Sequence, residues 1–325
     1  MTTTSPTTAP PAISALGLCK SYGDKVVLDG IDLAVPEGTV FALLGPNGAG
    51  KTTTVQILST LIAPDAGRAR VAGHDLTERP EGVRAAIGVT GQFAAVDHLL
   101  TAEENLLLMA DLQHLPRREG RRRAAGLLRR FELTEAARGP VSTFSGGMRR
   151  KLDLAMTLVG DPRIIFLDEP TTGLDPRSRR TMWEIIRGLV TEHGVTIFLT
   201  TQYLEEADQL ADRIAVLDRG RLVAEGTAEE LKRRVPGGHI RLRFSDAAEL
   251  EAAARHFGGA ARDLDELTLR VPGDGGVPAL RAVLDTLDDA AVRAESLTVH
   301  TPDLDDVFLT LTGHGTPDTA TEMAR

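Results

Sequence analysis

Residues 45–52 read Gly-Pro-Asn-Gly-Ala-Gly-Lys-Thr, and this glycine-rich stretch decides the fold of the chain. The apolar run from Val40 to Leu44 precedes it and is typical of a buried strand, while apolar residues at helical spacing follow it. A strand, a glycine-rich loop and a helix in this order form the context of a phosphate-binding loop. The stretch therefore predicts a site for a nucleoside triphosphate.

Each residue type in this loop suits one part of a bound triphosphate. Gly45 and Gly50 allow a tight turn that points successive backbone N–H groups at the β-phosphate. Lys51 reaches the β- and γ-phosphates, and the Thr52 hydroxyl is a ligand for Mg²⁺. The predicted nucleotide-binding residues of the loop are Gly45, Pro46, Asn47, Gly48, Ala49, Gly50, Lys51, Thr52 and Thr53.

Length and composition limit the class of protein. The chain has 325 residues, 42% of them hydrophobic, which is enough for one large globular domain and a small one. A net charge of −9 argues against a general nucleic-acid binder, so the arginines clustered between residues 117 and 130 are interpreted as a solvated helix face. The single cysteine, Cys19, excludes an intramolecular disulfide and is interpreted as a small core residue.

No apolar run approaches the roughly 18 residues that a membrane-spanning helix needs. Residues 1–11 form a polar Thr/Pro-rich tail that lacks the basic and apolar regions of a signal peptide, and we expect this tail to be disordered. If a membrane is involved, we expect another polypeptide to supply the spans.

The rest of the first 235 residues alternates between strand and helix patterns. Alternating apolar residues from Ile13 to Val35 predict antiparallel strands, and Tyr22 lies between them either as a packing residue or stacked on a nucleotide base. Thr101 and Glu104 form a capping box at the start of a helix. This helix and the Arg-rich helix around residues 117–130 together predict an α-helical insert over about residues 93–160.

Two further stretches have polar groups suited to phosphate chemistry. The apolar strand from Ile164 to Leu167 ends in Asp168 and Glu169, where open α/β sheets bind their ligands. We expect Asp168 to hold Mg²⁺, directly or through water, and Glu169 to act as general base toward the attacking water. The start of the helix at Ser145-Gly146-Gly147 suits an anion, although Ser-Gly-Gly is also an ordinary loop.

The clearest linker is Pro236-Gly237-Gly238. It divides a nucleotide-binding domain, residues 12–235, from residues 236–313, whose alternating strand and helix patterns predict a small α+β domain. Residues 314–325 are expected to be a frayed tail.

The order of these motifs, with Gln92 after a strand and Gly173-Leu174-Asp175 after Asp168-Glu169, resembles that of ABC-type ATPase domains over residues 13–235. The resemblance implies an α/β P-loop NTPase core with an antiparallel β subdomain and an α-helical insert. It also implies ATP and Mg²⁺ as cofactors and a head-to-tail homodimer in which two ATP molecules are sandwiched. A monomer is then expected to be nearly inactive.

The resemblance assigns roles to the matching residues. Tyr22 stacks on adenine, and Gln92 contacts Mg²⁺ and senses the membrane partner. Ser145, Gly146 and Gly147 contact the γ-phosphate of ATP bound to the opposite subunit. Asp168 lies on the metal side, Glu169 and Lys51 belong to the catalytic set, and Asp175 lies in a loop that crosses the dimer interface.

Three positions depart from the family pattern. Phe144 and Met148 stand where the signature usually has Leu and Gln. Gln202 stands where the family has a catalytic switch histidine. Glutamine can donate a hydrogen bond to the γ-phosphate but cannot titrate near neutral pH, so we expect slower or less pH-sensitive hydrolysis.

Gln202 lies in the stretch 200–208, Thr-Thr-Gln-Tyr-Leu-Glu-Glu-Ala-Asp, which resembles the ATPase subunits of daunorubicin/doxorubicin-resistance exporters. Leu304-Asp305-Asp306-Val307-Phe308-Leu309 is similar to a segment of the same proteins, and its apolar residues share a helix face that is either core or a regulatory patch. This resemblance implies an ATPase that is peripheral to the cytoplasmic face of the cell membrane. It would power a separate transmembrane permease that exports a small hydrophobic drug or antibiotic.

Two alternatives remain open at this stage. The cargo of such an exporter can instead be a lipid, a polysaccharide or a peptide. A soluble ABC protein that acts on ribosomes or DNA is the other alternative. Such proteins usually carry two ATPase domains or a long coiled-coil insertion, and the acidic balance of this chain disfavours a nucleic-acid partner.

Overall fold

The computed structural model describes residues 10–92, 95–235, 238–273 and 275–312. These residues group into two compact units that divide between Ala228 and Glu229, upstream of the boundary predicted after residue 235. The predicted tails, 1–11 and 314–325, lie outside the described residues except for Pro10 and Pro11, and the predicted linker is described only at Gly238. Each unit is therefore considered by itself.

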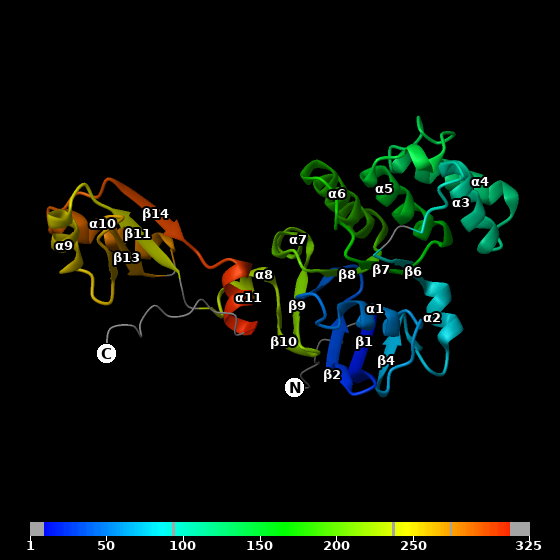
Figure 1. Cartoon of the computed structure of the whole chain (residues 1–325), viewed down its shortest axis with the longest axis horizontal. Helices are drawn as coiled ribbons and strands as arrows, with labels where there is room; N and C mark the ends of the chain where they lie inside the picture. The colour runs from blue at the N-terminus through cyan, green and yellow to red at the C-terminus, as the bar shows by residue number, and fades with distance from the viewer. Residues whose placement is uncertain (1–9, 93–94, 236–237, 274, 313–325) are drawn as a thin grey trace, which may run out of the picture. The chain divides into compact units, whose positions relative to one another are not determined.

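A six-stranded sheet forms the centre of the first unit (Figure 1). Its order is β10-β9-β3-β8-β7-β6, with all neighbours parallel except the β9–β10 hairpin. Because β3, β7 and β8 are buried along their whole length, their sequences are continuous apolar runs rather than alternating ones. The strands are β3 (Val40–Leu44), β6 (Ile87–Thr90), β7 (Ile164–Asp168), β8 (Thr196–Thr201), β9 (Arg213–Asp218) and β10 (Arg221–Gly226).

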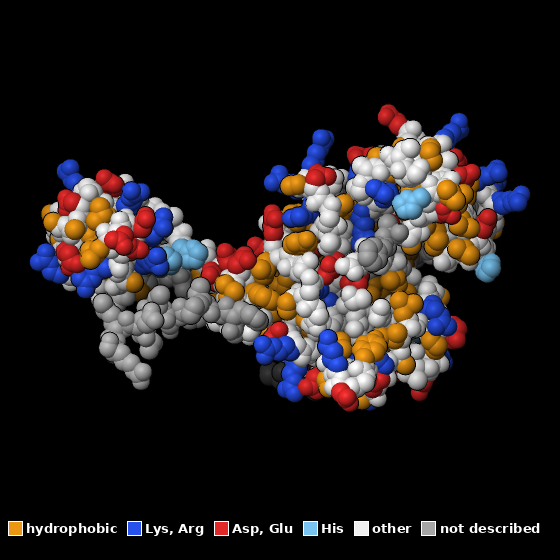
Figure 2. Space-filling view, in the orientation of Figure 1, with side chains coloured by type: hydrophobic (Ala, Val, Ile, Leu, Met, Phe, Trp, Pro, Cys, Tyr) orange, Lys and Arg blue, Asp and Glu red, His pale blue; other side chains and the backbone are white. Residues whose placement is uncertain are grey.

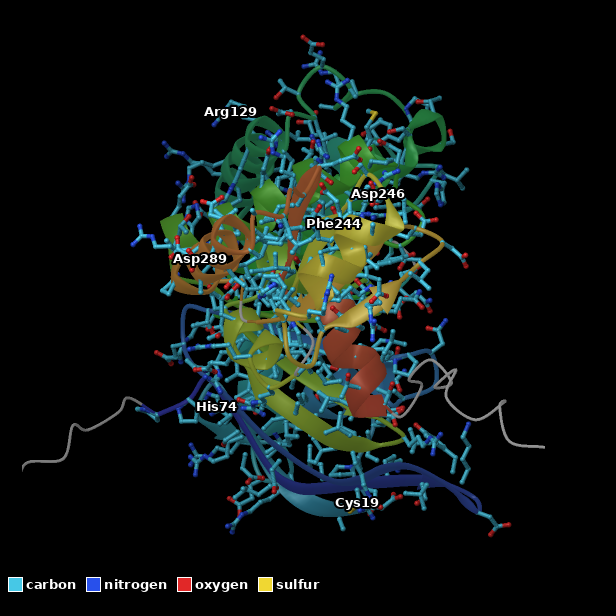
Figure 3. All side chains as sticks on the ribbon, turned by 90° about the vertical axis from the view of Figure 1, so that its left-hand side faces the viewer. Cys19, His74, Arg129, Phe244, Asp246 and Asp289 are labelled. Carbon is cyan, nitrogen blue, oxygen red and sulfur yellow. The ribbon has the colours of Figure 1, made fainter. Side chains whose placement is uncertain are left out.

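A second, antiparallel sheet has the order β2-β1-β4-β5. It contains β1 (Ile13–Tyr22), β2 (Lys25–Val35), β4 (Ala66–Val71) and β5 (His74–Asp75), and the antiparallel pairing of β1 with β2 is as predicted. Cys19 lies on β1 of this sheet and is only partly buried, so its interpretation as a core residue was wrong (Figure 3). Successive side chains of a strand point to opposite faces, so the side chain of Leu18, rather than that of Cys19, points into the core.

Helix α1 (Lys51–Leu58) lies between the two sheets and contacts strands of both. Its apolar residues Val55 and Ile57 join one hydrophobic core with Phe41, Phe166 and Phe198 of the central sheet. The sequence analysis did not predict α2 (Pro80–Ala86), which adds Val83 to this core. Helices α5 (Gly146–Thr157), α6 (Pro176–His193) and α7 (Leu204–Leu210) cover the opposite face of the central sheet (Figure 1).

The predicted helical insert comprises α3 (Ala102–Leu112), α4 (Arg117–Arg130) and α5, with two short 3-10 turns, η1 (Val141–Thr143) and η2 (Leu158–Gly160). The predicted capping box begins α3, because Thr101 Oγ1 accepts the Glu104 N–H and Glu104 Oε2 accepts the Thr101 N–H. In α4, Arg122 and Arg123 both pair with Glu119. On the face drawn in Figure 2, Lys and Arg side chains are interspersed with Asp and Glu.

The second unit contains a sheet of order β12-β13-β11-β14, antiparallel throughout. Phe244 is buried in its core, and Asp246 caps the helix that follows (Figure 3). Leu304 and Val307 are buried and Phe308 partly so. The elements are α8 (Ala228–Lys232), β11 (His239–Arg243), α9 (Ala247–Ala254), β12 (Ala261–Asp263), β13 (Thr268–Pro272), α10 (Val277–Asp289), β14 (Ser296–His300) and α11 (Leu304–Thr312).

Across the parts of the chain that the structure describes, no helix combines the length and the apolarity needed to cross a bilayer.

Replacing either of two glycines of α4 by alanine should change the stability of the chain in opposite directions. A Cβ on Gly126 meets no atom within 4 Å, whereas a Cβ on Gly120 lies 2.8 Å from the Ala110 Cβ. We expect Gly126→Ala to stabilise the chain by about 0.5–1 kcal/mol because alanine is the better helix former. Gly120→Ala should instead destabilise it through overpacking. Denaturant titration of both variants checks this, and equal shifts would contradict the described packing of α3 on α4.

Candidate functional site

Strands β3, β8 and β7 end at one edge of the central sheet, and their register brings the predicted site residues together. Leu44 pairs with Thr201, and Thr200 pairs with Asp168. The Gly45 N–H donates to the Thr201 carbonyl at 3.2 Å, which joins the glycine-rich loop to the end of β8. The loop, the Asp168-Glu169 pair and the position of Gln202 therefore adjoin one another at the carboxyl edge of the sheet.

The loop backbone requires glycine for two different reasons. Gly48 and Gly50 have φ of 82° and 112°, which L residues rarely adopt. A Cβ on Gly45 would lie 2.3 Å from the Leu217 carbonyl oxygen, so the loop can approach β9 only without a side chain there. Helix α1 begins directly after Gly50, and no side chain caps its N-terminus. An uncapped helix N-terminus behind a turn of this kind favours an anion.

Lys51 and Glu169 form a buried ion pair beside this loop. The Lys51 Nζ lies 3.3 Å from Glu169 Oε1 and donates to the carbonyls of Gly45 and Pro46 at 2.9 and 3.1 Å. The two side chains are only 4% and 8% exposed. Thr172 Oγ1 donates to the other oxygen of the Glu169 carboxylate. The carboxylate is thus held next to the lysine that is predicted to bind phosphate.

Glu169 also has an unusual backbone conformation. Its φ is 50°, in the left-handed region, which costs an L residue about 1–2 kcal/mol. The Glu169 N–H donates to both the carbonyl and the Oγ1 of Thr200, each at 3.1 Å. These bonds to β8 fix the turn that directs the chain away from the sheet. Such strain is typical of functional positions.

Asp168 is buried at the end of β7, and its Oδ1 accepts a 2.6 Å hydrogen bond from Thr200 Oγ1. The Thr52 hydroxyl lies in the first turn of α1, on an exposed residue. No cluster of three or more His, Cys, Asp or Glu side chains suited to a metal occurs among the described residues. The hydroxyl and carboxylate oxygens present fit Mg²⁺, which is usually held by one or two protein ligands plus phosphate and water.

The Ser-Gly-Gly segment begins α5, and Ser145 is its N-cap, with Oγ accepting the Met148 N–H at 3.2 Å. A Cβ on Gly147 would lie 2.8 Å from Ser178 Oγ, which donates to Asp175 Oδ2 at 2.6 Å. That hydrogen bond is the largest of the effects that lower the pKa of Asp175. Ser145, Gly147 and Asp175 therefore belong to one local surface, on the helical side of the central sheet (Figure 1).

The other predicted residues lie at strand ends. Gln92 is exposed two residues after β6, and Gln202 is partly buried directly after β8. Tyr22 ends β1 with its side chain half exposed, and the Lys20 ammonium lies 5.7 Å from the centre of its ring. Their contacts with ATP and Mg²⁺ remain predictions.

Three buried polar residues around the site were not predicted from the sequence, namely Thr200, Arg150 and Glu206. Glu206 accepts hydrogen bonds from Thr171 Oγ1 at 2.7 Å and from Trp183 Nε1 at 3.2 Å. It thereby connects α7 to the loop after β7 and to α6. Burial raises the pKa of Glu206. In the sequence, Glu206 stands beside Glu205, and Arg150 stands between Arg149 and Lys151, so neither burial nor partner is revealed.

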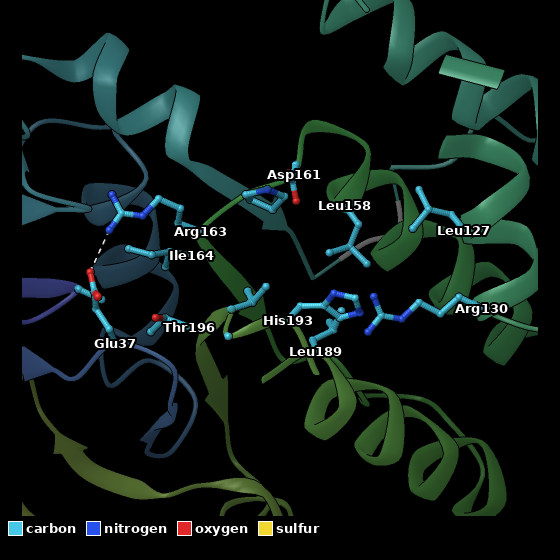
Figure 4. A pocket seen from close by; sticks show the side chains of 14 residues that line it. Glu37, Leu127, Arg130, Leu158, Asp161, Arg163, Ile164, Leu189, His193 and Thr196 are labelled. Atoms are coloured by element: carbon cyan, nitrogen blue, oxygen red, sulfur yellow. Dashed lines mark hydrogen bonds and ion pairs between the residues drawn. The ribbon is translucent and has the colours of Figure 1, made fainter. Parts of the chain in front are cut away.

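The opposite, amino edge of the sheet carries a separate pocket of about 410 Å³. It is lined by Leu127 and Arg130 of α4, Ile164 of β7 and His193 of α6 among others (Figure 4). None of the predicted site residues lines it. Its volume alone does not identify it as the functional site, because the glycine-rich loop and the carboxylates lie at the other edge.

Glu206 predicts a pH-dependent component of stability. The folded chain holds its proton more tightly than the unfolded chain, whose carboxyl titrates near 4.5. Glu206 therefore favours folding below that pH, and the contribution is lost as the pH rises through the raised value. The parent should lose this contribution as the pH rises above 4.5, whereas Glu206→Gln has no such contribution to lose. We therefore expect the melting temperature of Glu206→Gln minus that of the parent to increase with pH.

Glu205→Gln, on the neighbouring exposed residue, is the matched control and should show no such trend. A Glu206→Gln variant whose melting temperature follows that of the parent at every pH would contradict the raised pKa.

Comparison with known proteins places this geometry among transporter ATPases. Residues 28–172 match the sequence family described as ABC transporter. The chain is 51% identical to the daunorubicin resistance ATP-binding protein DrrA2 of Streptomyces coeruleorubidus, with 96% of this chain and 98% of the relative covered. It is 38% identical to the Nod factor export ATP-binding protein I of Ralstonia nicotianae, over 93% and 94% of the two chains.

Among solved structures, the first unit resembles nucleotide-bound cassettes. A dimeric ATP-binding cassette in a post-hydrolysis state, bound to ADP and Pi, aligns with a TM-score of 0.61 and 26% identity, covering 66% of this chain and 98% of that chain.

Proposed function

Because this chain belongs to the ABC transporter family of ATP-binding proteins, we propose that it hydrolyses ATP as a head-to-tail homodimer that drives a separate membrane subunit. The observation that carries this proposal is the meeting of the glycine-rich loop with Lys51, Asp168 and Glu169 at one edge of the sheet. The proposed place of action is the cytoplasmic face of the cell membrane, where the chain is peripheral.

The binding step uses fixed backbone groups and one cation. The loop N–H groups and the N-terminus of α1 receive the β-phosphate, and Lys51 neutralises the β- and γ-phosphates. Thr52 and Asp168 would hold Mg²⁺, with Gln92 beside them, and the ion would neutralise charge on the phosphate oxygens. Tyr22 would offer its half-exposed ring to adenine.

For hydrolysis, Glu169 accepts a proton from the attacking water, and Gln202 donates a hydrogen bond to the γ-phosphate. The γ-phosphate draws Lys51 toward itself, which leaves the Glu169 carboxylate available to the water. Ser145, Gly146 and Gly147 of a second copy of this chain complete the site from the opposite side. The exposure of Ser145 and Gly146 on this chain supports that arrangement.

The proposed cargo is a small hydrophobic drug or antibiotic. Relatives covering nearly the whole chain are named for daunorubicin resistance, which supports this choice. A different cargo, such as a lipid, polysaccharide or peptide, is the second candidate, supported by the relative named for Nod factor export. Efflux of a hydrophobic drug from cells that express the chain with a candidate membrane subunit supports the first cargo class, and export of a lipid, polysaccharide or peptide without drug efflux supports the second.

The role of Glu169 is tested by Glu169→Gln, which keeps the shape of the side chain but removes the base. We expect ATP binding to persist while turnover falls at least about 100-fold, as is typical for loss of a general base. The variant should also accumulate as a dimer in ATP, measured by light scattering. Glu184→Gln, an exposed carboxylate on α6, is the control. Parent-like turnover in Glu169→Gln would remove Glu169 from this role.

The switch position is tested by Gln202→His. We expect turnover that is preserved or raised, and a new pH dependence between about pH 5 and 8, because histidine titrates in that range and glutamine does not. The measurement is kcat against pH for parent and variant. A completely inactive but folded variant would show that residue 202 does not occupy the switch position.

A further inference from the structure

A buried arginine connects three parts of the proposed ATPase site. Arg150 is on α5, only 7% exposed, five residues after Ser145. Its guanidinium donates from Nε to the Pro170 carbonyl at 2.9 Å, from Nη1 to the Gly91 carbonyl at 2.8 Å and from Nη2 to the Asp168 carbonyl at 3.2 Å. The Asp168 carbonyl ends β7, the Pro170 carbonyl lies in the segment after β7, and the Gly91 carbonyl belongs to the residue before Gln92.

A carboxylate on the same helix completes this arrangement. Asp153 Oδ2 accepts from Arg150 Nη1 at 3.2 Å, and Asp153 Oδ1 accepts the Ala95 N–H at 2.9 Å. Arg150 and Asp153 thus hold Gly91 and Ala95, on either side of Gln92 along the chain. Both side chains are buried, and burial is the main cause that lowers the pKa of Arg150 and raises that of Asp153.

This geometry requires arginine. A guanidinium offers five N–H donors in a rigid planar fork. The four hydrogen bonds of Arg150 reach the segment that contains Asp168 and Pro170, the Gly91 carbonyl and Asp153 on its own helix. The ammonium of lysine is a point charge with three rotatable donors and cannot reproduce that fork. The segment after β7, the Gly91 and Ala95 backbone and helix α5 consequently cannot move independently while these bonds persist.

We propose that Arg150 is a positioning residue that couples the two half-sites of the chain. It ties the half that binds this chain's own ATP, through the Asp168 and Gly91 carbonyls, to the half at Ser145 that meets the partner's ATP. This inference rests on the proposed ATPase function. The contacts of Arg150 are with backbone carbonyls and Asp153, and it acts through the backbone atoms that it holds.

The test measures amide hydrogen exchange of the full chain with and without ATP, at a protein concentration at which it remains monomeric, so that a partner cannot protect α5. We expect ATP to slow exchange of residues 45–53 in both the parent and Arg150→Lys. In the parent, ATP should also slow exchange in α5, and Arg150→Lys should lose this second effect. Arg149→Lys, on the adjacent partly exposed residue, is the matched control and should behave like the parent.

Turnover gives an independent measure on the same variants. Arg150→Lys should lower kcat about tenfold or more while the KM for ATP stays within about twofold, because coupling rather than binding is lost. If Arg150→Lys is too unstable, the double variant Arg150→Gln/Asp153→Asn removes both charges of the buried ion pair together and should lose the same protection of α5.

Three results would overturn the proposal. ATP-dependent protection of α5 that survives in a folded Arg150→Lys variant would show that coupling does not need the guanidinium. Loss of protection at residues 45–53 together with that of α5 would show a merely structural role. An absence of protection at residues 45–53 in the parent itself would instead contradict the proposed ATPase function on which the inference rests.

Discussion

The common end of three parallel strands is the constraint on which the rest of the site depends. Because β3, β8 and β7 pair in register, the first residue after β3, the last residues of β8 and the carboxylates after β7 are brought to one edge. Thr200 links both carboxylate residues to β8, because its hydroxyl donates to Asp168 and accepts from the Glu169 N–H. The strands are buried on both faces, so the edge is rigid. Rigid placement of donors and acceptors is what phosphoryl transfer mainly requires of a protein.

What the sequence predicted well is what is contiguous in the chain. The glycine-rich loop and Asp168-Glu169 each carry their signal within a few residues, and the capping box at Thr101 was identified in the same way. The fold class followed from the order of these signals and from the family resemblance. Family relatives and solved structures then supported the ATPase fold independently.

The burial and the partners of single side chains could not be predicted from the sequence, because they depend on strand order and on which face of a helix or strand points inward. Arg150 lies in the run Arg149-Arg150-Lys151, which looks like solvent-exposed charge until the Gly91 and Pro170 carbonyls are placed around it. Glu206 is hidden in the same way beside Glu205, which is exposed. Cys19 was assigned to the core, because a small apolar residue in a strand does not show which face it occupies.

In the proposed dimer, the loop at Gly45 and the helix start at Ser145 are halves of two different sites, each completed only by a second copy of the chain. Because Cys19 is the only cysteine, a Cys19→Ser background allows a clean cross-linking experiment. Asn47→Cys and Thr143→Cys, both at exposed positions, can be combined in that background and treated with a short thiol cross-linker with and without ATP. We expect a covalent dimer that forms only with ATP, whereas a cross-link within one chain, leaving a monomer, would contradict the two-copy site.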